Sequence, residues 1–298
     1  MKLIINKLKK IFHNKPFNFL LKTIGFIILF YFILTKIDLN DLLITFKKIK
    51  LKTLIFSIIL VNISYLFNAL RFKAYLDYDN QQYSLKDAIN ITYRCSFFNS
   101  CLPGGIGGDG YKFLLLKQYG MSKIRAIQLC LSDRISGLYV IAIACFILLL
   151  ATNIKFLQGI HLSYVIIITS LGIILSTIVY NIIAQTLKEK RAATAKAFIF
   201  SLLNEIAIVM TQMVIYGDLG VKIFDLNYIL ATLISFLSLI VPISLGGAGV
   251  REVCLVFLSN YILIDADTAL LGALCFFCIC TIINILSSIS FLIKIEHK

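Results

Sequence analysis

Long apolar runs, separated by short polar segments, follow one another along almost the whole chain. A helix that crosses a hydrocarbon core of about 30 Å needs about 20 apolar residues. Six of the runs predict such helices, and the pattern therefore indicates an all-α polytopic membrane protein that forms one domain over residues 1–298. The predicted spans are 17–35, 53–70, 126–150, 162–184, 197–216 and 268–293.

Three further runs, at 88–102, 228–245 and 250–264, are predicted not to cross the membrane. Lys and Arg collect on the cytoplasmic side of membrane proteins, so the loop charges assign the sides and place both chain ends in the cytoplasm. The run 88–102 must then enter and return on the basic side, and the other two must enter from the acidic side. We expect six full spans and two opposed re-entrant helical hairpins. The basic loops are 1–15, 71–86, 112–125, 188–196 and 294–298, and the acid-leaning loops are 217–226 and 264–268.

The stretch 36–52 does not fit this scheme, because it is basic yet falls on the acidic-loop side. Its apolar residues recur near helical spacing with lysines opposite, which predicts a short helix at the membrane interface. The lysine-rich residues before the run 17–35 resemble the start of a signal peptide. No small-residue cleavage site follows that run, so we expect an uncleaved first helix.

The composition agrees with a membrane domain. Of the 298 residues, 59% are hydrophobic and 15% are charged, whereas soluble domains carry about 25% charged residues. The loop lysines and arginines account for the net charge of +14, and no basic domain remains outside the spans to bind nucleic acid. The three histidines are scattered and no GxSxG or HExxH motif occurs. We therefore expect no enzymatic activity, no metal and no cofactor.

Two glycine-rich segments match each other without a gap at a single offset (242 − 103 = 139). A proline, a pair of glycines, a further glycine and a final basic residue coincide in the two segments. Irregular backbone at membrane depth lies within protein or lines a wet cavity, and matched breaks in two halves are typical of inverted-repeat transporters. Close helix packing at glycine is the alternative explanation. The halves are centred on 88–112 and 228–252, with loop residues Pro103, Gly104, Gly105, Gly107 and Gly108 in the first and Pro242, Gly246, Gly247 and Gly249 in the second.

Several charged residues lie beside or inside the apolar segments. A charged side chain near the bilayer centre costs about 2.5 kcal/mol or more, so it needs a partner or a water-filled cavity. Arg134 is expected to pair with Asp109 or Glu252, or to bind a phosphate through its planar guanidinium. The neighbouring Asp133 points to another face of the same helix and is expected to pair separately.

Two further polar residues have two interpretations each. Glu205 is either a proton-coupling carboxylate or a polar contact near the start of its helix, and Asn99 is either a ligand or a hydrogen-bonding contact between helices. Helix N-termini at the two glycine-rich breaks would favour an anionic headgroup. The candidate substrate-binding residues are Asp109, Lys112, Arg134, Arg251, Glu252 and Asn99.

The combined motifs resemble those of the lysylphosphatidylglycerol synthase transmembrane family, which is also described as flippase-like. The resemblance extends from about Phe17 to Lys294. It implies translocation of a lipid, either an aminoacylated phospholipid, as in the flippase half of MprF-type proteins, or a polyprenyl-phosphate-linked sugar. The matching motifs are Phe98-Asn99, Leu102-Pro103-Gly104-Gly105, Gly107-Gly108-Asp109, Ser132-Asp133-Arg134 and the segment from Pro242 to Glu252.

The chain departs from the family pattern in two respects. Lys112 stands near the place where family members often carry an arginine, which keeps the charge but loses the bidentate fork. The chain has no aminoacyl-transferase domain, so we expect no synthesis of lysylphosphatidylglycerol.

The sequence as a whole favours an inner-membrane flippase for an anionic lipid or lipid-linked intermediate. One alternative is an integral-membrane transferase that modifies a lipid carrier. The other is a non-transporting accessory subunit of envelope glycan assembly. Enzymes that modify lipids or envelope glycans are the protein partners that these readings suggest.

Overall fold

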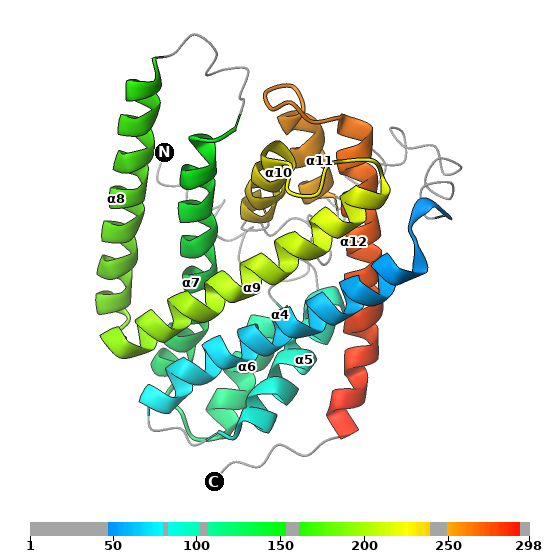
Figure 1. The fold of residues 1–298 in the computed structure, drawn as a ribbon. Helices are drawn as coiled ribbons and strands as arrows, with labels where there is room; N and C mark the ends of the chain where they lie inside the picture. Colours follow the sequence, from blue (N-terminus) through cyan, green and yellow to red (C-terminus); the bar gives the residue numbers. More distant parts are fainter. Residues whose placement is uncertain (1–46, 80–82, 102–106, 153–160, 239–248, 293–298) are drawn as a thin grey trace, which may run out of the picture.

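All regular elements in the described part of the chain are helices (Figure 1). Five of them are long and apolar enough to cross a membrane, and they confirm five of the six predicted spans. They are α4 (Leu51–Tyr78), α7 (Lys123–Leu149), α8 (Leu162–Thr186), α9 (Arg191–Asp218) and α12 (Ala266–Leu286), which continues into the 3-10 turn η3 (Ser287–Leu292). The computed structural model describes residues 47–79, 83–101, 107–152, 161–238 and 249–292. The predicted span 17–35 and most of the stretch 36–52 lie outside these ranges.

Four shorter helices form two pairs, α5 (Leu85–Cys101) with α6 (Gly107–Gln118), and α10 (Leu226–Leu237) with α11 (Val250–Leu258). At a rise of 1.5 Å per residue the four are about 25, 18, 18 and 14 Å long, which is less than the ~30 Å hydrocarbon core. The two pairs lie at opposite ends of the bundle, with α5 and α6 at the bottom of Figure 1 and α10 and α11 at the top.

The run 250–264 is helical only as far as Leu258. The hydroxyl of Ser259 donates to the carbonyl of Val256 at 2.7 Å, and the amide of Asn260 donates to that of Phe257 at 3.2 Å. Such local bonds compete with helix continuation. The prediction of a half-helix reaching residue 264 is therefore wrong by about two turns.

The polar turns gather at the two ends of the bundle (Figure 1). We call the end with turns 119–122 and 187–190 the basic-loop end, and the end with turns 219–225 and 259–265 the acidic-loop end. At the acidic-loop end, the backbone N–H of Lys50 donates to Asp218 Oδ2 at 2.8 Å, and its ammonium lies 3.4 Å from the same carboxylate. This ion pair explains how the basic residues next to α4 lie at the end assigned to acidic loops.

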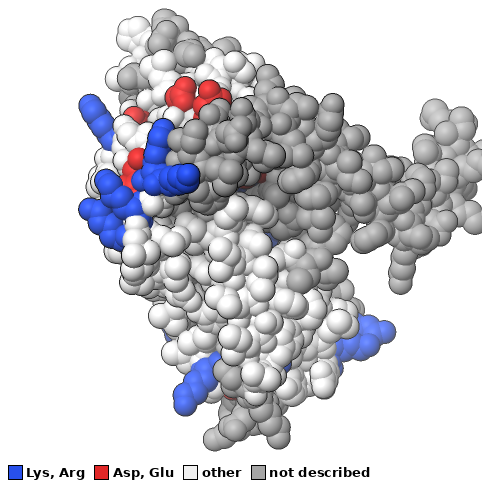
Figure 2. All heavy atoms as spheres, turned by 90° about the vertical axis from the view of Figure 1, so that its right-hand side faces the viewer, with Lys and Arg blue, Asp and Glu red and all other residues white. Residues whose placement is uncertain are grey.

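The outer surface is apolar between the two ends. Figure 2 shows charged side chains at the top and bottom of one face and an uncharged region between them. On α8, large aliphatic side chains point outward, including Ile168 at 56% exposure and Leu171 at 60%. In lipid such exposure is favourable, which agrees with a membrane protein.

The buried apolar residues form two main clusters, one around each pair of short helices. The first joins α10 and α11 to the long helices α7, α9 and α12, and the second joins α5 and α6 to α4 and α7. The long helices α4, α7 and α9 contribute side chains to both clusters. They therefore form a common frame that holds the two short pairs.

At two of the predicted basic loops, a helix with a buried cation occupies residues that were expected to lie in the loop. Residues 71–86 were expected to form a basic loop, but α4 continues to Tyr78 and Arg71 is buried within it. Residues 112–125 were also expected to form a loop, but Lys112 is buried inside α6. Both errors have the same cause, a buried carboxylate on α7 that compensates the two cations.

Candidate functional site

Two pairs of opposite charge join α6 to α7. Asp109 Oδ2 lies 2.9 Å from Arg134 Nη1, and Lys112 Nζ lies 2.5 Å from Asp133 Oδ2. Residues three apart share a helix face, so Asp109 and Lys112 both reach α7. Of the partners expected for Arg134, the structure shows Asp109. It also confirms that Asp133 pairs separately.

Arg71 completes the second pair into a buried triad of Arg71, Asp133 and Lys112. Its Nε donates to Asp133 Oδ1 at 2.7 Å, so the carboxylate lies between two cations. Each of the three residues is at most 7% exposed. Arg71 also donates to Asn68 Oδ1 at 2.6 Å and to Ser201 Oγ at 3.4 Å. The triad therefore ties α4, α6, α7 and α9 together.

Arg71 was not predicted as a site residue, because a charge at the end of an apolar run usually indicates the start of a loop. Its partner lies 62 residues away along the chain, which no local pattern can show. One signal was present in the sequence. Phe72, Tyr75 and Leu76 keep the three- and four-residue spacing of a helix beyond Arg71, and all three are buried.

The Asp109–Arg134 pair differs from the triad in its accessibility. The side chains of Arg134 and Asp109 are 32% and 28% exposed, whereas those of Lys112 and Asp133 are 8% and 3% exposed. The ammonium of Lys112 also lies 4.6 Å from the centre of the Phe72 ring. A ligand can thus reach Arg134 and Asp109, while Lys112 is enclosed by protein.

Asn99 fixes the start of α6 against α5. Its Oδ1 accepts a hydrogen bond from the backbone N–H of Gly108 at 2.7 Å, which satisfies one free donor at the helix N-terminus. A Cβ on Gly108 would lie 2.8 Å from the carbonyl oxygen of Cys95, so only glycine permits this approach. Of the two interpretations of Asn99, the structure shows the contact between helices. Gly107 is buried beside Gly108, and Pro103, Gly104 and Gly105 lie outside the described residues.

Arg94 on α5 is a further cation within an apolar segment, and it was not among the predicted site residues. Its guanidinium donates to Tyr111 Oη at 3.0 Å and to the carbonyl of Ser290 at 3.1 Å, and it lies 5.0 Å from the Phe291 ring centre. A cation at carbonyls that end a helix is favourable. Arg94 therefore holds α5 and α6 on η3. The signal was available, because Arg94 lies within the apolar run 88–102.

In the second short pair, Gly249 and Glu252 shape the start of α11. Gly249 has φ of 94°, a left-handed conformation that favours glycine. Its backbone N–H donates to Glu252 Oε2 at 2.7 Å. Glu252, a residue of α11 itself, therefore accepts from the backbone at the start of that helix. Asn99 does the same for α6 from the neighbouring helix α5. Pro242, Gly246 and Gly247 lie outside the described residues.

Arg251 is enclosed between α10, α11 and α12. Its Nη2 donates to the carbonyl of Ala273 at 2.7 Å, and its guanidinium lies 5.3 and 4.8 Å from the ring centres of Phe236 and Phe276. Its Nε lies 3.8 Å from Glu252 Oε1. Among the described residues, no hydrogen bond or ion pair joins this group to the Asp109–Arg134 pair or to the triad.

Glu205 lies at the middle of α9 and not near its start, so that part of the prediction is wrong. The helix begins at Arg191, six residues before the predicted run (197 − 191 = 6). One carboxylate oxygen accepts from the amide of Asn204 at 3.0 Å. In the part of the chain that the structure describes, no cluster of His, Cys, Asp and Glu could hold a metal ion.

Comparison with known protein families gives a match over most of the chain. The family model of the Lysylphosphatidylglycerol synthase TM region matches residues 19–288, which is most of the chain. No curated protein matches the sequence. The match covers both short helix pairs, all five described spans up to Ser288 and every charged residue of the candidate site. The chain therefore belongs to the lysylphosphatidylglycerol synthase transmembrane family.

Proposed function

We propose that this protein translocates an anionic lipid across the inner membrane, and that Arg134 receives the lipid phosphate. The observation that carries the proposal is a partly exposed guanidinium inside a membrane span, paired with a carboxylate of similar exposure. An ion pair within the bilayer that remains reachable is costly unless a polar ligand or water uses it. The planar fork of arginine suits a phosphate.

The position of Asp109 supports the same assignment. Asp109 is in the first turn of α6, where free N–H groups and the helix dipole favour negative charge. A phosphate that displaces the Asp109 carboxylate from Arg134 would meet the same positive end of α6. Asp109 would then be free to contact a cationic or hydroxyl-bearing headgroup. Family membership favours an aminoacylated phospholipid or a polyprenyl-phosphate-linked sugar.

The other candidate residues are assigned supporting roles. Lys112 and Arg251 add positive potential, but protein groups already bind their donors. Asn99 and Glu252 hold the N-termini of α6 and α11. The phosphate contact is therefore assigned to Arg134, which is the most accessible of the three cations proposed for it.

The arrangement of the short helices supports alternating access through two re-entrant hairpins. The helices of both pairs are shorter than the hydrocarbon core, and the two pairs lie at opposite ends of the bundle (Figure 1). Lys112 and Arg251, which coincide in the repeat, are both buried and both face an aromatic ring. These parallels favour an inverted repeat, in which one half rocks against the other. In this proposal the basic-loop end is cytoplasmic.

Replacing Arg134 with alanine tests the proposal. In phosphatidylcholine vesicles that contain chain-labelled fluorescent phosphatidylglycerol, we expect wild-type protein to accelerate translocation, measured by bleaching of the outer-leaflet label. Arg134→Ala should slow it about tenfold, the equivalent of ~1.4 kcal/mol in the barrier. Arg134→Lys should be intermediate.

The matched control is Arg191→Ala, since Arg191 is exposed at the start of α9 and far along the chain from the site. This variant should translocate at the wild-type rate. A folded Arg134→Ala protein with unchanged translocation would remove Arg134 from the lipid path. If wild-type protein translocates no anionic lipid faster than protein-free vesicles do, the proposed function itself is wrong.

A further inference from the structure

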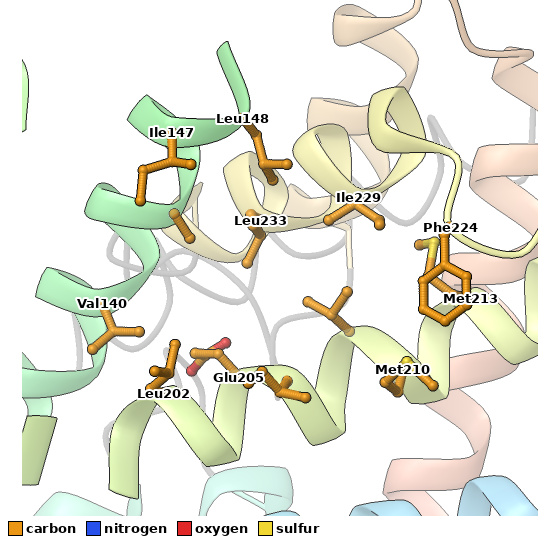
Figure 3. A pocket seen from close by; sticks show the side chains of 13 residues that line it. Val140, Ile147, Leu148, Leu202, Glu205, Met210, Met213, Phe224, Ile229 and Leu233 are labelled. Atoms are coloured by element: carbon orange, nitrogen blue, oxygen red, sulfur yellow. The ribbon is translucent and has the colours of Figure 1, made fainter. Parts of the chain in front are cut away.

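A groove opens between α7, α9 and α10, with a volume of about 310 Å³. Its walls are almost entirely aliphatic or thioether side chains, and Glu205 is the one ionisable residue among the 13 that line it (Figure 3). Figure 3 shows the Glu205 carboxylate pointing from α9 into the space below α10. A cavity with such walls does not favour water, so its natural occupant is apolar.

The groove opens to the surface at hydrocarbon depth. Rim residues Ile147, Ile206 and Phe224 are 53%, 51% and 61% exposed, and the first two lie on membrane-spanning helices. The medium at this depth is lipid chains. Met210 and Met213 line one wall, and their unbranched thioethers adapt to a flexible occupant.

The groove extends from the acidic-loop end toward the middle of α9. It is lined by Phe224 in the turn at the acidic-loop end and extends along α9 past Glu205 to Leu202, which is 16 residues before the end of α9 (218 − 202 = 16). That distance is about 24 Å along the helix axis, and α9 is inclined in Figure 1, so the depth is smaller.

The turn at the mouth of the groove carries an available cation. Asp218 is paired with Lys50, and Asp225 accepts from the N–H of Asn227 at 2.9 Å to cap α10. Both carboxylates beside the turn are therefore engaged. Lys222 is exposed two residues before Phe224, and within the described residues it has no ion-pair partner. The cation of Lys222 suits the phosphate of a lipid, and the apolar groove next to it suits a hydrocarbon chain of the same lipid.

We propose that this groove holds one hydrocarbon chain of an anionic phospholipid from the leaflet at the acidic-loop end, with the phosphate at Lys222. The lipid keeps its ordinary orientation, and the chain runs past Phe224 and Met213 toward Glu205. The site is distinct from the Asp109–Arg134 pair. It rests on the proposed function only for the membrane placement of the protein, because occupancy does not require translocation.

The absence of tryptophan from the sequence permits a direct test. A single tryptophan is introduced either at the rim of the groove (Ile206→Trp) or on the lipid-facing side of α8 (Ile174→Trp), where Ile174 is 55% exposed. The proteins are reconstituted in phosphatidylcholine vesicles with increasing fractions of chain-brominated phosphatidylglycerol. Quenching of tryptophan fluorescence measures contact with the brominated chain.

We expect quenching of Ile206→Trp to saturate while the brominated lipid is still a minor fraction, and quenching of Ile174→Trp to rise in proportion. Brominated phosphatidylcholine should need about a fivefold higher fraction, the equivalent of ~1 kcal/mol for one lysine at an anionic headgroup. Lys222→Gln, which changes an exposed side chain, should abolish that preference. Ala144→Phe, which fills the groove from α7, should remove the saturable component.

Identical, proportional curves for the two tryptophans would overturn the site. An unchanged lipid preference in Lys222→Gln would overturn the placement of the phosphate. Because this experiment does not measure translocation, the groove can prove absent while Arg134→Ala still slows transport. In the converse outcome, quenching in the groove saturates but the protein does not translocate lipid. That result would support the lipid site and contradict the flippase function.

Discussion

Replacing Asp133 with alanine is expected to destabilise the helix bundle so strongly that little folded protein is recovered. The change leaves Arg71 and Lys112 buried without their shared carboxylate. Breaking a buried ion pair by removing one partner costs about 3–5 kcal/mol, and here two cations lose a partner. Total stabilities are about 5–15 kcal/mol. Thermal unfolding and gel filtration in detergent measure the effect.

Two matched variants separate charge from packing in this triad. Asp133→Asn keeps the shape and the acceptor oxygen but loses the charge, so its midpoint of thermal unfolding should lie between wild type and alanine. Combining Asp133→Leu with Arg71→Met and Lys112→Met should restore much of the stability, because apolar residues often replace a buried ionic group without loss. An Asp133→Ala protein as stable as wild type would show that the triad contributes nothing.

Replacing Arg251 with alanine is expected to have the second largest effect, and chiefly on stability. The guanidinium fills the space between Phe236 and Phe276. Its loss opens a cavity and leaves the Glu252 carboxylate buried at 1% exposure without its cation. Each effect costs about 3 kcal/mol or more. Glu252 Oε1 has no hydrogen-bond partner among the described residues, so the ion pair with Arg251 is its compensation.

Arg251→Lys and Arg134→Ala provide the contrast. Lysine at position 251 keeps the charge and the aromatic contact but has no planar fork, so we expect a smaller loss of stability. Arg134→Ala should leave the unfolding temperature almost unchanged while slowing translocation, because the Arg134 side chain is partly exposed. The reverse order, a stable Arg251→Ala and an unstable Arg134→Ala, would contradict the roles assigned to the two arginines.

Local sequence patterns were sufficient for the long helices. A span is decided by about 20 neighbouring residues, and the five described spans match the predicted runs in place and order. The helix ends were less predictable. α4 continues through Arg71 because Asp133 compensates its charge, and α11 ends at Leu258 because side chains after it bind its carbonyls.

The candidate site was predictable in its members but not in their pairing. A charge beside or inside an apolar run was enough to single out Asp109, Asp133 and Arg134. Which carboxylate faces which cation depends on the packing of α6 against α7, and the sequence left two partners open for Arg134. Arg251 is buried whereas Arg134 is partly exposed, and spacing along the chain does not predict this difference in exposure.

The depth of the two short helix pairs is the most direct test of the proposed transport path. Single cysteines at Ser100, near the end of α5, and at Ser238, after α10, would be labelled from each side of sealed vesicles in a protein without its eight native cysteines. Lys117→Cys and Asn260→Cys mark the two sides. If the pairs are re-entrant, Ser100→Cys labels only from the side of Lys117→Cys, and Ser238→Cys only from the side of Asn260→Cys. Labelling of either from the opposite side would show an ordinary crossing and contradict the account.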